Sequence, residues 1–193
     1  MIVAGVDEAG RGALAGPVVA AAVVLPDLFP RDILADSKIL SDARRRIACN
    51  KIRQHCDWGV GIVSAEEIDE IGIKRATRKA MWEAIQQLRM KPDTLLVDGK
   101  DRFHFPIESK DCIRGDATCP EISAASIVAK VVRDDLMIDL GRQFAAFDFV
   151  RNKGYASSFH LRLLEQEKYT PEHRKTYEPL RTYLVQRRLF VEL

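Results

Sequence analysis

The sequence lacks any apolar run that approaches the ~20 residues of a membrane-spanning helix. Its longest apolar run, 17–25, is rich in Val and Ala and follows Asp7, Glu8 and Arg11. A secretory signal peptide has a basic start and no early acids, so the same pattern argues against such a signal. We therefore predict a cytoplasmic protein that makes no use of a membrane.

The sequence also lacks the short motifs of several common sites. Its four cysteines include no Cys-x-x-Cys pair, which argues against a zinc site and predicts free thiols in a reducing compartment. Residues 5–10 lack the spacing of a dinucleotide fingerprint, and no phosphate-binding loop or nucleophile elbow occurs. The histidines have no metal-ligand spacing, so each is interpreted as a core or surface residue: His55, His104, His160 and His173.

Neither sign of charge is in large excess. The 30 Lys and Arg residues against 28 Asp and Glu residues give a net charge of +2, which by itself does not indicate a nucleic-acid binder. Residues 1–150 carry about −2, whereas residues 151–193 contain nine basic and five acidic residues and carry about +4. The basic end is interpreted either as a solvated helix surface or as part of a binding surface.

The 193 residues, 47% of them hydrophobic, are typical of one globular domain with at most a small appendage. Short apolar runs predict strands at 2–6, 18–25, 58–63, 94–97 and 107–113. Helices are predicted at 41–55, at 64–90 with Gly72 as a candidate break, at 123–147, at 157–168 and at 179–188. This order favours a mixed α/β sheet with helices on its faces, followed by a small helical extension.

Acidic residues stand at the ends of three predicted strands. Asp7 and Glu8 close the first strand, Asp98 closes the fourth, and Asp116 follows the fifth. Because sites in open α/β sheets gather where strands end, these carboxylates are candidate ligands of a hard cation such as Mg²⁺. Adjacent residues on a regular strand point to opposite faces, so Asp7 and Glu8 share a site only if the strand ends or bulges there. The alternative is that these acids cap helices and form turns.

Two polar segments near these acids allow more than one interpretation. Gly10-Arg11-Gly12 lets the backbone approach a ligand closely and offers an arginine that can hold a phosphate, although a Gly-x-Gly pattern often occurs by chance. Arg133 and Asp134, in the long predicted helix, are expected to make ordinary ion pairs on the helix surface or in tertiary contacts.

The residues around these acids resemble a known family. Residues 5–18, Gly-Val-Asp-Glu-Ala-Gly-Arg-Gly-Ala-Leu-Ala-Gly-Pro-Val, closely resemble the opening of ribonuclease HII, the bacterial type-two ribonuclease H. The resemblance then continues in family order across nearly the whole chain, through Asp36-Ser-Lys38, Val97-Asp-Gly99, Gly115-Asp116, the Ser-Ala-Ala-Ser-Ile-Val-Ala-Lys-Val block at 123–131, Arg133-Asp134, Gly154-Tyr155, His160 and His173-Arg174.

This resemblance implies a ribonuclease H-like mixed five-stranded sheet flanked by helices at 1–150, and a helical C-terminal extension at 151–193 that takes part in substrate binding. It implies an endonuclease that cleaves RNA in RNA–DNA hybrids and at single ribonucleotides embedded in duplex DNA, leaving 3′-hydroxyl and 5′-phosphate ends. The family uses Mg²⁺, or Mn²⁺ as a substitute, in a two-metal mechanism. Its catalytic, metal-binding acids fall on Asp7, Glu8, Asp98 and Asp116.

The resemblance also implies roles in substrate binding. Gly10, Arg11 and Gly12 would read the ribose 2′-OH, which distinguishes RNA from DNA. Tyr155 would pack on the sugar beside the junction, and Lys38 would make a positioning contact with the nucleic-acid backbone.

The sequence departs from the family pattern at a few positions. Ala13 stands where the family has Pro, Ile39 replaces a second Lys, Ser157 replaces Thr, and the late His-Arg-x-Ser-Phe ends in Tyr177. None of these changes a catalytic acid, so we expect them to affect substrate affinity rather than chemistry. Residues 186–193 match poorly the peptide by which some relatives bind the sliding clamp, so we do not expect that partner. We also expect the protein to be a monomer.

Three related functions remain as alternatives at this point. A non-catalytic module that binds hybrids would require a lost acid, and no acid is lost. A different ribonuclease H-like nuclease, such as a junction resolvase, would cut substrates made only of DNA. Ribonuclease HIII carries an additional N-terminal domain, for which a catalytic motif that starts at residue 7 leaves no room.

Overall fold

The computed structural model describes residues 1–34 and 40–191, with side chains up to residue 186. Lys38 and Ile39 lie outside the described residues. A five-stranded sheet in the order β3-β2-β1-β4-β5 forms the centre of the molecule. Its strands are β1 (Val3–Ala9), β2 (Val18–Val24), β3 (Asp57–Val63), β4 (Thr94–Asp98) and β5 (Glu108–Cys112). The first three strands are antiparallel neighbours and β4 and β5 run parallel to β1, which confirms the predicted mixed sheet.

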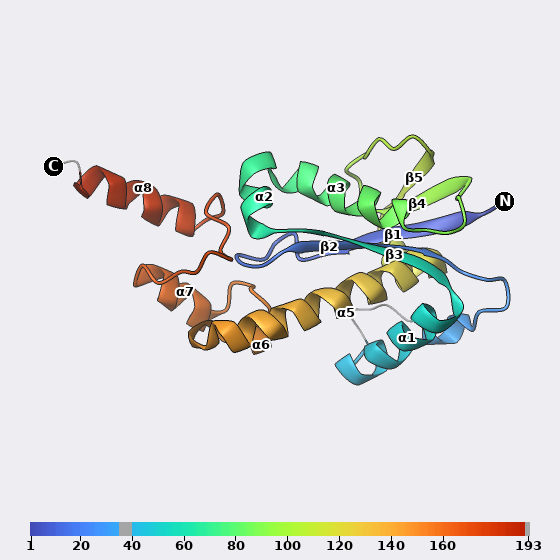
Figure 1. Cartoon of the computed structure of the whole chain (residues 1–193), viewed down its shortest axis with the longest axis horizontal. Helices are drawn as coiled ribbons and strands as arrows, with labels where there is room; N and C mark the ends of the chain where they lie inside the picture. Colours follow the sequence, from blue (N-terminus) through green and yellow to red (C-terminus); the bar gives the residue numbers. More distant parts are fainter. Residues whose placement is uncertain (35–39, 192–193) are drawn as a thin grey trace.

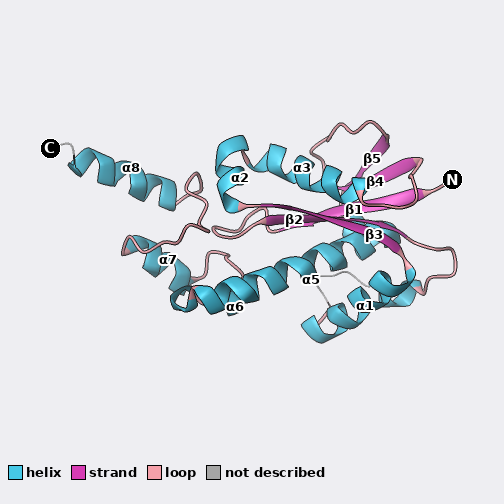
Figure 2. Cartoon of the chain, in the orientation of Figure 1, coloured by secondary structure: helices cyan, strands magenta, loops and turns pink. Residues whose placement is uncertain are grey.

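Helices cover both faces of the sheet, as Figures 1 and 2 show. Helix α3 (Ile73–Gln86), preceded by α2 (Ala65–Ile71), packs on one face. Helices α5 (Pro120–Gln143) and α1 (Asp42–His55) pack on the other. Because both of its faces are covered, β2 is buried along its whole length, which explains its unbroken Val-Val-Ala-Ala-Ala-Val-Val sequence.

Glycines bring the two helical layers into backbone contact with the sheet. A Cβ atom at Gly5 of β1 would lie 2.0 Å from the carbonyl carbon of Glu121 in α5. A Cβ atom at Gly61 of β3 would lie 2.0 Å from the carbonyl oxygen of Ala80 in α3. Helix α5 therefore crosses β1 closely enough for polar side chains farther along the helix to reach the end of that strand.

Serine side chains begin three of the predicted helices. Ser41, Ser64 and Ser157 each accept a hydrogen bond from the backbone N–H three residues later, at the starts of α1, α2 and α7 (Ser158–Glu165). Gly72, with φ of +80°, separates α2 from α3 and confirms the predicted break. Helix α5 begins three residues earlier than predicted, with Pro120 in its first turn, where a missing N–H costs nothing.

The C-terminal part of the chain is helical, as predicted. Its elements and the remaining short helices are η1 (Arg31–Ile33), α4 (Gly115–Thr118), η2 (Ala145–Phe147), α6 (Phe149–Asn152), α7 and α8 (Leu180–Val191). Leu14, in the loop after β1, packs with Leu164 of α7 and Leu180 of α8, so this loop and the C-terminal helices share one apolar cluster. Among the described residues, no helix has the length and apolar character needed to cross a membrane.

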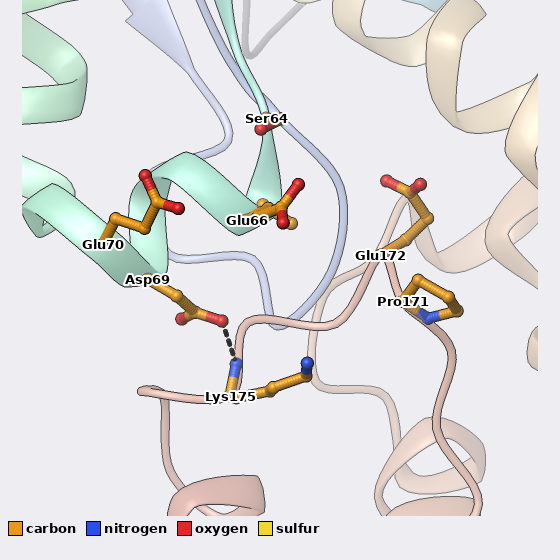
Figure 3. A pocket seen from close by; sticks show the side chains of 8 residues that line it. Ser64, Glu66, Asp69, Glu70, Pro171, Glu172 and Lys175 are labelled. Atoms are coloured by element: carbon orange, nitrogen blue, oxygen red, sulfur yellow. Dashed lines mark hydrogen bonds between the residues drawn. The ribbon is translucent and has the colours of Figure 1, made fainter.

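A second contact joins the C-terminal segment to α2. The carboxylate of Asp69 accepts hydrogen bonds from the backbone N–H groups of Lys175 (2.7 Å) and Thr176 (2.9 Å) and from the Thr176 hydroxyl (2.6 Å). Figure 3 shows the first of these bonds at the border of a cavity of about 420 Å³, with Glu172 on its opposite side. The segment around residue 174 is thereby fixed from two sides, by α2 and by the loop after β1.

Candidate active site

The carboxylates of Asp7 and Glu8 lie within β1 rather than beyond its end. The strand continues to Ala9 and pairs regularly there with β2, so the predicted strand end at Val6 is wrong. Successive side chains of a regular strand alternate between faces. Asp7 shares the α5 face with Gly5, and Glu8 shares the α3 face with Val6.

The two carboxylates nevertheless border one pocket, because the sheet is open beside them. β1 and β4 pair only as far as Val6 and Val97, and the next residue in this register, Asp98, ends β4 beside Asp7. Side chains from both faces of β1 therefore reach the same opening, which lies beside β1 where β4 ends. The resulting pocket has a volume of about 520 Å³, and its lining includes these three carboxylates, the Gly10–Gly12 loop and Tyr155.

The pocket is electrostatically unfavourable for its own carboxylates. Asp7 is 6% exposed, and its Oδ1 accepts a hydrogen bond of 2.7 Å from the backbone N–H of Glu8. Burial raises the pKa of Asp7 well above its usual range, and the charges of Glu8 and Asp98 raise it further. Burial also raises the pKa of Glu8, although Arg11 opposes this shift. A cation bound here would relieve the repulsion.

Arg11 supplies one compensating charge. Its guanidinium donates to the Glu8 carboxylate at 3.2 Å and to the Asp101 carboxylate at 2.6 Å. Asp101 lies in the loop between β4 and β5, and the sequence analysis did not single it out. No local pattern distinguishes Asp101 from other surface acids, because only the fold brings it within reach of a residue 90 positions earlier.

Asp98 and Asp116 are linked through the backbone. The Asp98 Oδ1 accepts a hydrogen bond of 2.7 Å from the N–H of Gly115, which begins the short helix α4. Asp116 is the next residue, is 3% exposed and does not border the pocket. The structure therefore brings three of the four predicted acids to one pocket, and the fourth follows directly after the glycine that bonds to Asp98.

Comparison with known proteins identifies the family of the chain. The model of the family described as Ribonuclease HII matches residues 4–179, which include all four acids. The chain belongs to the ribonuclease HII family. It is therefore a ribonuclease H, an endonuclease that acts on RNA–DNA hybrids.

Ribonuclease HII relatives match along most of their own length. Ribonuclease HII of Vibrio campbellii is 45% identical over 184 residues, which cover 95% of this chain and 87% of the relative. Ribonuclease HII of Bacillus cereus (strain Q1) is 46% identical over 180 residues, which cover 93% of this chain and 70% of the relative. The crystal structure of the ribonuclease H2 from Pyrococcus horikoshii OT3 superposes with a TM-score of 0.81 at 29% identity, covering 97% of this chain and 99% of that one.

The ribonuclease HII pocket offers oxygen ligands, which suit a hard divalent ion. As the side chains stand, no group of three or more His, Cys, Asp or Glu residues is gathered tightly enough to hold a metal within residues 1–34 and 40–191. Glu8 contributes to this lack of a gathered ligand set, because its carboxylate forms an ion pair with Arg11. The donor chemistry therefore fits a divalent ion, while closing the ligand set requires side-chain movement.

The loop that carries Gly10 is fixed by a buried arginine of α5. A Cβ atom at Gly10, where φ is +94°, would lie 1.9 Å from the Arg133 Nε. The Arg133 guanidinium donates to the carbonyl oxygens of Pro17 (3.0 Å), Lys153 (3.0 Å) and Ala15 (3.2 Å). Burial lowers the pKa of Arg133 to about 10, which leaves it charged at neutral pH. The prediction of an ordinary ion pair is therefore wrong for Arg133.

A second buried arginine fixes the same loop from the C-terminal segment. The Arg174 guanidinium donates to the carbonyl oxygens of Arg11 (2.8 Å) and Gly16 (2.9 and 3.1 Å). The Tyr177 hydroxyl also donates to the Arg11 carbonyl, at 2.8 Å. Tyr177 is one of the departures from the family pattern, and its hydroxyl makes a hydrogen bond that a phenylalanine could not make.

Tyr155 is held in place by contacts with Arg133 and with a pair of histidines. The Arg133 guanidinium carbon lies 5.3 Å from the centre of the Tyr155 ring, which is a cation–π contact. The Tyr155 carbonyl oxygen lies 2.9 Å from His160 Nδ1, and His160 Nε2 lies 2.8 Å from His173 Nε2. The two histidines are buried, as an ordinary core role predicts, but they form a hydrogen-bonded pair that the sequence analysis missed.

Three further polar residues line the pocket and were not predicted: Arg45, Ser126 and Lys130. Ser126, Lys130, Arg133 and Asp134 follow the i, i+4, i+7, i+8 spacing of one helix face, in a helix whose other residues around them are mostly apolar. This spacing is a signal that could have identified the face of α5 that meets the active site. Asp134 makes the predicted ion pair, with Lys130 at 2.6 Å.

Proposed function

We propose that this ribonuclease H cleaves not only the RNA of RNA–DNA hybrids but also single ribonucleotides embedded in duplex DNA, leaving 3′-hydroxyl and 5′-phosphate ends. The observation that carries the proposal is the pocket itself, in which Asp7, Glu8 and Asp98 meet the Gly10–Gly12 loop and Tyr155. A single 2′-hydroxyl can be recognised where exposed backbone and an aromatic ring stand beside the reacting phosphate.

We propose Mg²⁺ or Mn²⁺ as the cofactor, held by Asp7, Glu8, Asp98 and Asp116. A solved structure of similar fold (TM-score 0.69, 16% identity) is the ribonuclease HIII called Bst-RNase HIII, in complex with Mn²⁺. Two divalent ions, when bound, would activate a water molecule and stabilise the leaving 3′ oxygen. The buried carboxylate of Asp7, close to the charges of Glu8 and Asp98, supports this assignment.

The chain's own residues then position the substrate. If Glu8 held a metal ion, Arg11 would keep its bond of 2.6 Å to Asp101 and could turn its remaining donors to a phosphate. The backbone of Gly10–Gly12 faces the ribose, because Arg133, Arg174 and Tyr177 hold the loop from behind. Tyr155, which is 40% exposed, stacks on the sugar with its ring fixed over Arg133.

The organisation that we propose has residues 1–150 as the catalytic part and residues 151–193 as an extension for substrate binding, in a monomer of the cytoplasm. A similar solved structure, with a TM-score of 0.76 and 29% identity, is the PCNA:RNase HII complex from Archaeoglobus fulgidus. PCNA is the partner of that protein, and our proposal for this chain includes no protein partner.

A cleavage assay tests the proposal. The protein is incubated with Mg²⁺ and a DNA duplex that contains one ribonucleotide, and we expect a single cut at that position. Asp7→Asn is expected to abolish cutting while the protein stays folded, whereas Asp27→Asn, on an exposed loop, is the matched control and keeps full activity. Binding without cleavage in both Mg²⁺ and Mn²⁺ would indicate a binding module, and cleavage of all-DNA junctions would indicate a resolvase.

A further inference from the structure

A cluster of basic side chains lies beside the active-site pocket, on the α3 face of the sheet. It is formed by Lys74, Arg75 and Arg78 in the first two turns of α3 and by Lys100 and Arg102 in the loop after β4. Together with the neighbouring loop residues these side chains line a depression of about 720 Å³. We call these five residues the basic surface. Asp101 is the one acidic residue of the depression.

The charges of the basic surface are largely unpaired. Lys74 is 3.9 Å from Asp101, and the same carboxylate is already engaged by Arg11 at 2.6 Å. In the described part of the chain, no carboxylate lies within ion-pair distance of the other four: Arg75, Arg78, Lys100 and Arg102. The basic surface therefore keeps an excess of positive charge that the protein itself does not neutralise.

Some basic residues elsewhere on the molecule are neutralised by neighbouring carboxylates. Lys79, one residue after Arg78 on α3, is paired with Glu67 at 2.6 Å and with Glu83 at 3.7 Å. Arg142 on α5 is paired with Asp139 at 2.8 Å. The five cations of the basic surface instead share the single carboxylate of Asp101, next to the active-site pocket.

The loop part of the basic surface is held in a defined shape. Phe103 is buried, and its ring centre lies 6.4 Å from that of Phe105. The Arg78 Nε donates a hydrogen bond of 2.9 Å to the carbonyl oxygen of His104, which ties the loop to α3. The cations of the loop and of α3 are therefore presented together, so that less ordering is required when a ligand binds.

The basic surface and the active-site pocket are continuous, because the ion pair between Arg11 and Asp101 forms their common border. Duplex nucleic acid carries one negative charge per ~1.7 Å of its axis, so a duplex that is cut at the carboxylates must place further phosphates outside the pocket. We propose that the basic surface binds backbone phosphates of the duplex arm on the α3 side of the cut. This inference rests on the proposed function, since it presupposes that the pocket receives such a duplex.

A charge-removal experiment tests the inference. The triple variant Arg75→Gln/Lys100→Gln/Arg102→Asn removes three of the four unpaired charges and keeps Arg78, which ties the loop to α3. Asn suits the left-handed conformation at position 102, where φ is +48°. The matched control Lys51→Gln/Lys91→Gln/Arg142→Gln removes three exposed charges elsewhere. Affinity is measured by fluorescence anisotropy in the Asp7→Asn background, so that no cleavage occurs. The probes are a duplex with long arms and a duplex shortened on both sides of its single ribonucleotide.

For the long duplex, we expect the triple variant to bind about tenfold more weakly than the control at ~0.1 M salt, with the slope of log K against log salt reduced by about 2 to 3. For the short duplex, the two variants should bind alike. With Asp7 intact, the triple variant should raise KM and leave kcat unchanged. Equal binding of the long duplex by both variants would refute the basic surface while leaving the proposed function intact. Absence of cleavage by the unmodified protein would instead refute the proposed function.

Discussion

The buried pair His160 and His173 predicts a specific loss of stability in acid. The backbone N–H of Thr170 donates to His173 Nδ1 at 2.9 Å, and the Tyr155 carbonyl accepts from His160 Nδ1 at 2.9 Å. These two partners fix the tautomers, so His173 Nε2 carries the proton that it donates to His160 Nε2 at 2.8 Å. Each ring is neutral in this arrangement, and an added proton on His173 must break the bond from Thr170.

The magnitude follows from the pKa of His173. Burial, together with the neighbouring His160, lowers the pKa of His173 from 6.5 to about 4. Because the unfolded chain takes up its proton first, stability is lost as pH falls from 6.5 toward 4. At ~1.36 kcal/mol per pKa unit, this one group makes the free energy of unfolding smaller at pH 4.5 than at pH 8 by about 2 to 3 kcal/mol. Burial lowers the pKa of His160 as well, which adds to the loss.

Urea unfolding between pH 4.5 and pH 8 measures this effect. The variant His173→Asn keeps an acceptor for the Thr170 N–H and removes the titrating ring. Between pH 8 and pH 4.5 its unfolding free energy should therefore fall by about 2 to 3 kcal/mol less than that of the unmodified protein. His55→Asn removes an exposed histidine and should leave the pH dependence unchanged. A pH profile of His173→Asn that parallels the unmodified protein would mean that His173 does not hold its neutral form in the fold.

Three further substitutions test other contacts. Tyr177→Phe removes the hydroxyl that donates to the Arg11 carbonyl, and we expect unfolding to become easier by about 1 kcal/mol in urea and KM for a single-ribonucleotide duplex to rise, with kcat retained. Gly5→Ala places a methyl group against the Glu121 backbone, and should lower the unfolding free energy by about 1–3 kcal/mol or more, with a matching fall in melting temperature. Asp7→Asn removes a carboxylate whose pKa is raised by burial and also by the charges of Glu8 and Asp98, and should increase the melting temperature in EDTA although it abolishes cleavage.

The sheet and its covering helices could be predicted because their signals are local. The Val-rich and Ala-rich run of β2 and the serine caps of α1, α2 and α7 each depend on a few neighbouring residues. The end of β1 could not be predicted in the same way. Asp7 and Glu8 are polar and lie shortly before Gly10, so their local sequence predicts a turn. Pairing with Ala21 and Ala20 of β2 nevertheless keeps them in the strand.

The residue types of the candidate site could be predicted from the sequence, but the contacts between distant residues could not. Asp7, Glu8 and Asp98 were identified from strand ends and from the family resemblance, and the structure brings them together. The partner of Arg11, Asp101, depends on how the loop after β4 folds back. Such contacts between distant segments leave no periodic pattern in a single sequence, whereas the polar face of α5 does leave one.

The two buried arginines connect the C-terminal segment to the loop beside the active-site pocket. Neither Arg133 nor Arg174 bonds to a carboxylate among the described residues; both donate to backbone carbonyls of the loop after β1. A buried charge without a counter-ion lowers stability unless its donors are satisfied, and the planar guanidinium presents five donors from three nitrogens that point in different directions. Lysine at position 174 would present its three donors from a single nitrogen, so we expect it to hold the Arg11 and Gly16 carbonyls less well. The loop beside Glu8 therefore takes its shape from residues more than 100 positions away. If this loop reads the substrate as we propose, changes in the C-terminal segment should alter recognition through the Arg11 carbonyl.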